Sequence, residues 1–152
     1  MATIYHRIPI RAEKSKVFEA LTTQEGFTHW WTQDCVVKPA VGFINEFRIG
    51  PDAHYRMKVI LFQPGRSVEW KCLNQHDDWS GTQVSFIVTE KGEYTYLDMR
   101  HTGLTGENEE YGSINFQWGQ YLALLKHYCE AEAKSGVGAP SSGPIAVAAA
   151  RN

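Results

Sequence analysis

Hydrophobic residues recur every three or four positions between residues 111 and 134, near the end of the chain. This spacing predicts a long amphipathic helix, because residues three and four apart lie on the same helix face. Its apolar stripe consists of Ile114, Trp118, Tyr121, Leu122, Leu125, Tyr128 and Cys129. The stripe needs an apolar surface to cover it, so we expect the rest of the chain to be organised around this helix.

Upstream of this helix, hydrophobic and polar positions alternate, which is typical of strands with one buried face. The predicted strands are residues 3–10, 43–49, 55–61, 68–72, 82–90 and 94–102, with a short extended segment at 36–38. Turn residues separate them, as at Lys91-Gly92-Glu93, where the last two strands form a hairpin. Pro9 marks the first strand as an edge strand or as ending there.

Two short helices are predicted between the first and second strands. Residues 12–22 place Val17, Phe18 and Leu21 at helical spacing, with charges on the opposite side. Thr23 is expected to cap a second helix over residues 24–31, because its hydroxyl can accept a hydrogen bond from a backbone amide. This helix ends at Trp30 and Trp31. Neighbouring residues point about 100° apart, so one indole should pack inward and the other should cap an opening.

These elements predict an α+β fold in which a curved antiparallel sheet of six or seven strands wraps around the long C-terminal helix. Residues 1–134 form a single domain. Residues 135–152 are rich in Gly, Ala, Pro and Ser, and we expect them to be a flexible C-terminal tail.

Composition and charge argue against several classes of function. A net charge of −2 without clustered Lys and Arg argues against binding of nucleic acid. The N-terminus lacks the features of a signal peptide and no apolar stretch is long enough to insert in a membrane, so we expect a cytoplasmic protein. Cys35, Cys72 and Cys129 are odd in number and widely spaced, which predicts reduced thiols rather than disulfides or a zinc site.

Aromatic residues are the one compositional excess, with five Trp, seven Tyr and seven Phe. Inward-facing aromatic rings can line a ligand pocket, and the alternative is a packed aromatic core that leaves no cavity. The candidate ligand-binding cavity between sheet and helix is lined by Trp30, Trp31, Phe47, Tyr55, Met57, Trp70, Trp79, Phe86, Met99, His101, Trp118, Tyr121 and Leu122.

Several motifs resemble one protein family. The segment RIPIRAEKSKVFEALTTQEGFTHWWT, at residues 7–32, is similar to the start of the domain shared with the C-terminal part of the activator of Hsp90 ATPase. SGTQV at 80–84, LDMRHTGL at 97–104 and the Trp118-Gly119 pair are similar to that family's later strands and final helix. The resemblance covers about residues 3–134 and implies the helix-grip fold of the START and Bet v 1-like superfamily.

The resemblance implies a cavity under the long helix that binds hydrophobic ligands. We therefore predict a small-molecule binding protein for a lipid, polyketide or polyphenol-like ligand, with the Trp30-Trp31 segment and the loop at 74–81 guarding the entrance. The first alternative is a cyclase or hydratase in which His101, with Tyr121 or Tyr55, carries protons. The second is a co-chaperone or interaction module with a chaperone as partner. The sequence leans against an enzyme, because His101 has no clear nucleophile beside it.

No cofactor is expected, because the chain lacks the glycine-rich motifs that bind nucleotides and the serine motif of hydrolases. His76, Asp77 and Asp78, together with His54, form a polar cluster without the spacing of a known metal site. We expect no bound metal there.

Overall fold

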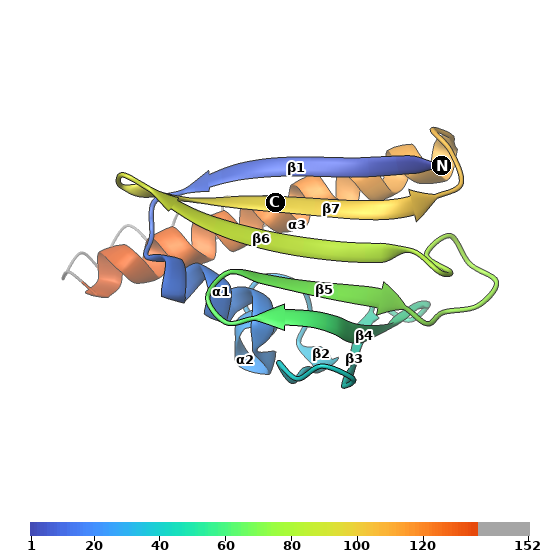
Figure 1. Cartoon of the computed structure of the whole chain (residues 1–152), viewed down its shortest axis with the longest axis horizontal. Helices are drawn as coiled ribbons and strands as arrows, with labels where there is room; N and C mark the ends of the chain where they lie inside the picture. The colour runs from blue at the N-terminus through green and yellow to red at the C-terminus, as the bar shows by residue number, and fades with distance from the viewer. Residues whose placement is uncertain (137–152) are drawn as a thin grey trace.

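The computed structural model describes residues 1–136, which form a seven-stranded antiparallel sheet with one long helix lying across it (Figure 1). This architecture confirms the predicted helix-grip fold. The proposed flexible tail, residues 135–152, lies outside the described residues except for 135 and 136, which continue the long helix. No helix in the described part of the chain is long and apolar enough to cross a membrane.

The sheet has the strand order β1-β7-β6-β5-β4-β3-β2, and every neighbouring pair is antiparallel. The strands are β1 (Ala2–Ile10), β2 (Asp34–Val36), β3 (Ile44–Ile49), β4 (Ala53–Gln63), β5 (Ser67–Cys72), β6 (Gln83–Lys91) and β7 (Tyr94–Leu104). The first strand therefore pairs with the last, and β1 is an edge strand, as Pro9 near its end predicts.

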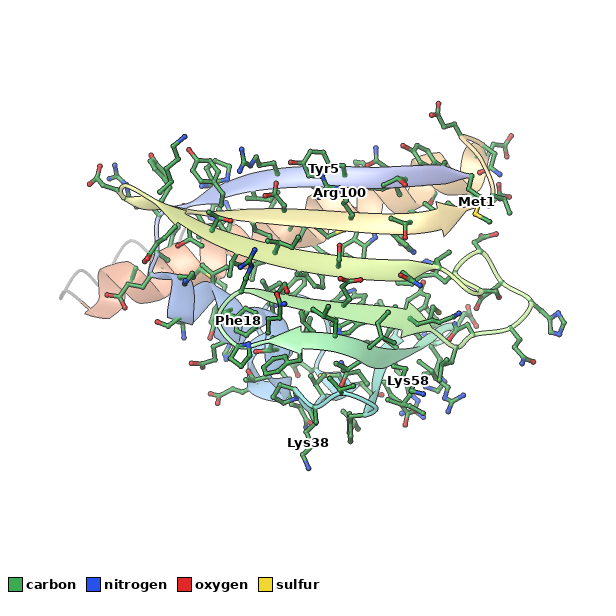
Figure 2. The ribbon with its side chains drawn as sticks, in the orientation of Figure 1. Met1, Tyr5, Phe18, Lys38, Lys58 and Arg100 are labelled. Atoms are coloured by element: carbon green, nitrogen blue, oxygen red, sulfur yellow. The ribbon has the colours of Figure 1, made fainter. Side chains whose placement is uncertain are left out.

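Alternation of side chains explains how each strand presents one face to the interior. In the β6–β7 hairpin, Val84 lies opposite His101 and Phe86 lies opposite Met99, and all four side chains are buried. On the opposite face, the guanidinium of Arg100 lies over the Tyr5 ring at 4.3 Å, and Tyr5 is 48% exposed. Figure 2 shows these two labelled side chains on the face of the sheet that points away from the long helix.

The two short helices follow β1, as expected: α1 (Lys14–Thr22) and α2 (Gln24–Thr28). Thr23 caps α2, since its Oγ1 accepts a hydrogen bond from the backbone amide of Gly26 at 3.0 Å. The second helix is shorter than predicted, and a turn carries Trp30 and Trp31. Both indoles are buried, so the expectation that only one of them packs inward is wrong.

Helix α3 (Glu109–Gly136) runs along one face of the sheet (Figure 1). The predicted stripe is confirmed, with Tyr121 and Tyr128 half-buried at its margin and the other members buried. Polar contacts tie the helix to β1 and the segment after it. Lys126 Nζ donates to the Pro9 carbonyl at 2.6 Å, and Glu130 Oε2 accepts from the Arg11 amide at 2.9 Å. The burial of the stripe and these bonds hold α3 against the sheet.

Replacing Gly26 by Ala is expected to lower the free energy of unfolding by about 1–3 kcal/mol, because the added methyl overpacks the contact between α1 and α2. A Cβ at Gly26 would lie 2.6 Å from the Ala20 Cα and 2.8 Å from the Glu19 carbonyl oxygen. Urea unfolding followed by circular dichroism measures the change.

Gly112→Ala is the matched control, because Gly112 is also helical and a Cβ there has no neighbouring atom within 4 Å. We expect this control to keep or raise the stability, by up to about 1 kcal/mol. Equal stabilities of the two variants would contradict the close approach of α1 and α2.

Candidate functional site

A cavity of about 330 Å³ lies between the sheet and the N-terminal half of α3. Its walls come from the end of β3, the start of β4, the loop between β5 and β6, the turn after α2, and α3. The start of β4, the β5–β6 loop and the start of α3 share one end of the molecule (Figure 1). The lining residues are Trp31, Ile49, Ala53, Tyr55, Trp79, Ile114, Gln117, Trp118 and Tyr121. We call this space the aromatic cavity.

The β5–β6 loop brings Trp79 to the cavity through a network centred on Asp77. The Asp77 Oδ1 accepts hydrogen bonds from the Trp79 amide at 2.9 Å and the Ser80 hydroxyl at 3.3 Å. Its Oδ2 accepts from the Asn74 side-chain amide at 2.8 Å. These bonds hold residues 74–80 in a defined turn. The Trp79 side chain packs at the cavity with only 6% of its surface exposed.

Stacked rings form the cavity wall. Tyr55 and Trp79 stack with ring centroids 4.0 Å apart, and the Trp118 ring lies 5.9 Å from Trp79. Trp31 closes the inner side, with its ring 5.5 Å from that of Trp118 and 6.2 Å from that of Tyr121. Offset and tilted contacts of this kind stabilise aromatic clusters and orient each ring. The wall is therefore fixed by ring packing.

A few polar groups remain for a ligand. Neither the Tyr55 nor the Tyr121 hydroxyl hydrogen-bonds to another described residue. The Trp31 Nε1 also has no partner, but it is buried within the ring packing and has almost no accessible surface, so it is not open to a ligand. Burial raises the pKa of Tyr55 to about 12, with a smaller contribution from the negative charge of Asp77. The Tyr55 phenol is therefore neutral at neutral pH and can donate or accept a hydrogen bond.

The structure places five of the proposed cavity residues around this space: Trp31, Tyr55, Trp79, Trp118 and Tyr121. The other eight lie in the packed core, away from the cavity lining: Trp30, Phe47, Met57, Trp70, Phe86, Met99, His101 and Leu122. For example, the Trp30 Nε1 donates to the Ala20 carbonyl at 2.8 Å, and the Trp70 ring meets that of Phe86 edge-on at 5.2 Å. These residues face inward, but ring packing fills the space around them.

Four lining residues were absent from the sequence-based set: Ile49, Ala53, Ile114 and Gln117. Alternation in β3 and the stripe of α3 gave a signal for Ile49 and Ile114 as inward-facing residues. Ala53 and Gln117 carried no such signal, because a small residue beside a turn and a polar helix residue also fit a solvent-exposed position.

His101 lies within a closed chain of hydrogen bonds. Its Nδ1 accepts from the Trp118 Nε1 at 3.0 Å, and its Nε2 lies 2.8 Å from the Thr82 Oγ1, which donates to the Trp79 carbonyl at 2.7 Å. An indole N–H is only a donor, so Nδ1 carries no proton and Nε2 donates to Thr82. His101 is fully buried, and burial lowers its pKa to about 4. Both nitrogens are engaged away from the cavity, which argues against His101 as a proton carrier.

A second hollow of about 520 Å³ adjoins the cavity and shares Ala53, Tyr55, Trp79, Ile114 and Gln117 with its lining. The remaining lining residues are mostly acidic: Asp52, His54, Asp77, Asp78, Glu109, Glu110 and Ser113. We call this hollow the acidic mouth. Within residues 1–136, no three His, Cys, Asp or Glu side chains are grouped to hold a metal. His54 instead pairs with Glu46, with 2.9 Å between His54 Nε2 and Glu46 Oε1.

The buried imidazole predicts a loss of stability in mild acid. Between the ordinary pKa of 6.5 and the folded value of about 4, the unfolded chain binds a proton at His101 that the folded chain does not. Stability is therefore lost as the pH falls through this window, by up to about 3 kcal/mol. Urea unfolding as a function of pH measures this loss.

His101→Gln provides the comparison, because an amide keeps hydrogen-bonding capacity but does not titrate. We expect a flatter pH dependence for this variant between the two pKa values. NMR of the wild-type protein gives a second measurement, in which the His101 ring signals stay constant from neutral pH down to pH of about 5. A His101 titration near neutral pH, or equal slopes for the two proteins, would contradict the buried, neutral state.

Comparisons with known proteins agree with this fold. A search of curated proteins finds no match. Among solved structures, the Aha1 dimer from Colwellia psychrerythraea is 30% identical, with a TM-score of 0.80 over 86% of this chain and 97% of that one. Protein MLL2253 from Mesorhizobium loti is 22% identical, with a TM-score of 0.74 over 82% of this chain and 94% of that one.

DynU16, from the dynemicin biosynthetic locus, shares the fold at 17% identity and a TM-score of 0.73, over 86% of this chain and 48% of that one. The family model described as "Activator of Hsp90 ATPase homolog 1-like protein" matches residues 11–130, which include both short helices and most of α3. The chain therefore belongs to the activator of Hsp90 ATPase homolog 1-like family.

Proposed function

We propose that the protein binds a hydrophobic or aromatic small molecule in the aromatic cavity. The observation that carries the proposal is the cavity itself: about 330 Å³, walled by rings from the sheet, a loop and α3. Ligand sites in proteins usually have volumes of about 300–1,000 Å³, apolar walls and a few polar groups that orient the ligand. The cavity has all three properties.

The arrangement of polar groups supports a ligand with a mainly apolar body and few hydrogen-bonding atoms. The Tyr55 and Tyr121 hydroxyls and the Gln117 amide are the polar side-chain groups of the lining besides the indoles. A lipid, a polyketide or a polyphenol-like compound meets this description. His101 is engaged elsewhere, so the proposal is a binding protein rather than a cyclase or hydratase.

The thiols support a cytoplasmic location as part of the same proposal. Cys35, Cys72 and Cys129 are free and buried. Burial raises the pKa of Cys72 to about 11 and that of Cys129 to about 12, so both stay protonated and unreactive. Free thiols are typical of proteins that work in a reducing compartment.

Binding should quench the intrinsic fluorescence of the protein, because Trp31, Trp79 and Trp118 line the cavity. We expect a saturable change with at least one compound from a panel of lipids, sterols, polyketides and polyphenols. Ala53→Phe, which places a ring in the cavity, should weaken that binding by at least about tenfold.

Ala133→Phe is the matched control, because Ala133 is exposed on α3, beyond the helix segment that lines the cavity. It should leave the affinity unchanged. A panel without any saturable response, or equal weakening by both substitutions, would contradict the proposal.

A second candidate function is interaction with a chaperone. The observation that favours it is the 30% identity to an Aha1 protein over 97% of that protein's length, together with membership of a family named for activation of Hsp90 ATPase. Immobilised protein should then retain purified Hsp90 and raise its rate of ATP hydrolysis. Absence of both effects would remove this candidate and leave the ligand-binding proposal untouched.

A further inference from the structure

Two phenol groups line the aromatic cavity, one from the sheet and one from the helix. Tyr55 lies on β4 and Tyr121 on α3, and both residues are half-buried. Neither hydroxyl has a hydrogen-bond partner among the described residues. Both hydroxyls keep accessible surface, because the one fully enclosed and unpartnered side-chain N or O atom in the described part of the chain is the Trp31 Nε1. A ligand can therefore reach the two phenols.

The two phenols lie near each other. Burial is the largest cause of the raised pKa of Tyr55, and the charges of Asp77 and Tyr121 add to it. An effect of Tyr121 on Tyr55 requires the two groups to be close, since charge interactions weaken with distance. With a pKa of about 12, Tyr55 keeps its proton at neutral pH and remains a donor. No hydrogen bond joins the two hydroxyls, so both can donate to a ligand.

The lining of the aromatic cavity contains no charged side chain. It includes no Lys, Arg, His, Asp or Glu. Gln117 is exposed at the rim, where its amide donates to the Ser113 hydroxyl at 3.5 Å. A charged ligand group among these residues would lose hydration without gaining an opposite charge, which costs free energy. An uncharged oxygen that accepts a hydrogen bond avoids this cost, so the lining favours an uncharged ligand.

The size and the rings of the cavity favour a flat ligand. Its volume of about 330 Å³ is at the lower end of the range for ligand sites, so it suits one or two rings better than a long acyl chain. The rings of Trp31, Tyr55 and Trp79 are nearly parallel, with angles of 18°, 25° and 26° between the three pairs. A flat ring of the same inclination can stack on this wall in the offset arrangement that aromatic pairs prefer.

From these features we propose that the ligand of the aromatic cavity is an uncharged compound of one or two aromatic rings with a carbonyl group, whose oxygen accepts hydrogen bonds from the Tyr55 and Tyr121 hydroxyls. A carbonyl oxygen has two lone pairs and can accept from both phenols at once. The inference rests on the proposed ligand-binding function and specifies its ligand class. Aromatic ketones and quinones fit the site, whereas long-chain lipids and carboxylates do not.

Three naphthalene derivatives with the substituent at the same ring position test this preference: acetylnaphthalene, isopropenylnaphthalene and naphthoate. The first two have nearly the same shape, because a methylene group replaces the carbonyl oxygen of the ketone in the alkene. Naphthoate adds a negative charge. Each compound is titrated against the intact protein by calorimetry. We expect the ketone to bind at least about fivefold more tightly than the alkene, as two hydrogen bonds predict, and naphthoate to bind most weakly.

Tyr55→Phe and Tyr121→Phe each remove one hydroxyl and keep the ring. Each should weaken binding of the ketone at least about threefold more than binding of the alkene, since only the ketone loses a hydrogen bond. The control is Tyr94→Phe, because Tyr94 lies at the start of β7, makes no hydrogen bond through its hydroxyl to a described residue and does not line the cavity. This control should keep the preference for the ketone.

The infrared spectrum of the bound ketone gives a second measurement. Hydrogen bonds weaken the carbonyl bond, so its stretching band should lie at a lower frequency in the protein than in an apolar solvent. The band should shift back in the double variant Tyr55→Phe with Tyr121→Phe. A band at the same frequency in the double variant would contradict the role of the two phenols.

The outcomes separate this inference from the proposed function. Equal or tighter binding of the alkene or of naphthoate, or equal effects of the three Tyr→Phe substitutions, overturns the carbonyl inference. If the alkene or the lipids and polyphenols of the wider panel bind in that case, the ligand-binding function stands without it. If nothing in either set binds, both proposals fall.

Discussion

The packing of aromatic rings around Trp31 is the constraint on which the rest of the structure depends. This indole follows α2 and reaches the space between sheet and helix, where it contacts rings from several elements. The rings in contact with it are those of Phe27, Trp30, Phe47, Tyr55, Trp70, Trp79, Trp118 and Tyr121. Trp31 therefore separates two regions. On one side Phe27, Phe47 and Trp70 fill the core, and on the other the rings stand at the cavity wall.

Much of the fold could be predicted from the sequence because two periodicities dominate it. Alternation in β6 and β7 gave the hairpin and its buried face, and the stripe of α3 gave the helix that covers the sheet. The ends of the helices were harder to predict from the sequence. The second short helix ends at Thr28, although Phe27, Trp30 and Trp31 are spaced as neighbours on one helix face and all three are buried. The helical spacing of these residues continues past the last helical residue, so the hydrophobic pattern could not mark where the helix stops.

The candidate site was harder to predict than the fold. Alternation with a period of two shows which side chains of a strand face inward. It does not show which of these side chains pack in the core and which line a cavity. Met57 and Tyr55 share a face of β4, yet Met57 is fully buried in the core and Tyr55 lines the cavity. Asp52 and Glu110, on separate segments, meet at the mouth only through the meander of the sheet and the return of α3. No local sequence signal encodes such a meeting.

The hydrogen bonds of His101 give this buried ionisable group a structural role, because they hold residues of the cavity wall in place. The chain of bonds from Trp118 through His101 and Thr82 to the Trp79 carbonyl joins α3, β7 and the β5–β6 loop, and it fixes two of the indole-bearing residues of the wall. Protonation of Nδ1 would remove the acceptor of the Trp118 N–H and place an unpaired charge in the core. Only the neutral ring keeps the wall intact. An imidazole that must stay neutral to hold its neighbours is poorly suited to exchange protons with a ligand, so the buried polar chain favours binding over catalysis in this cavity.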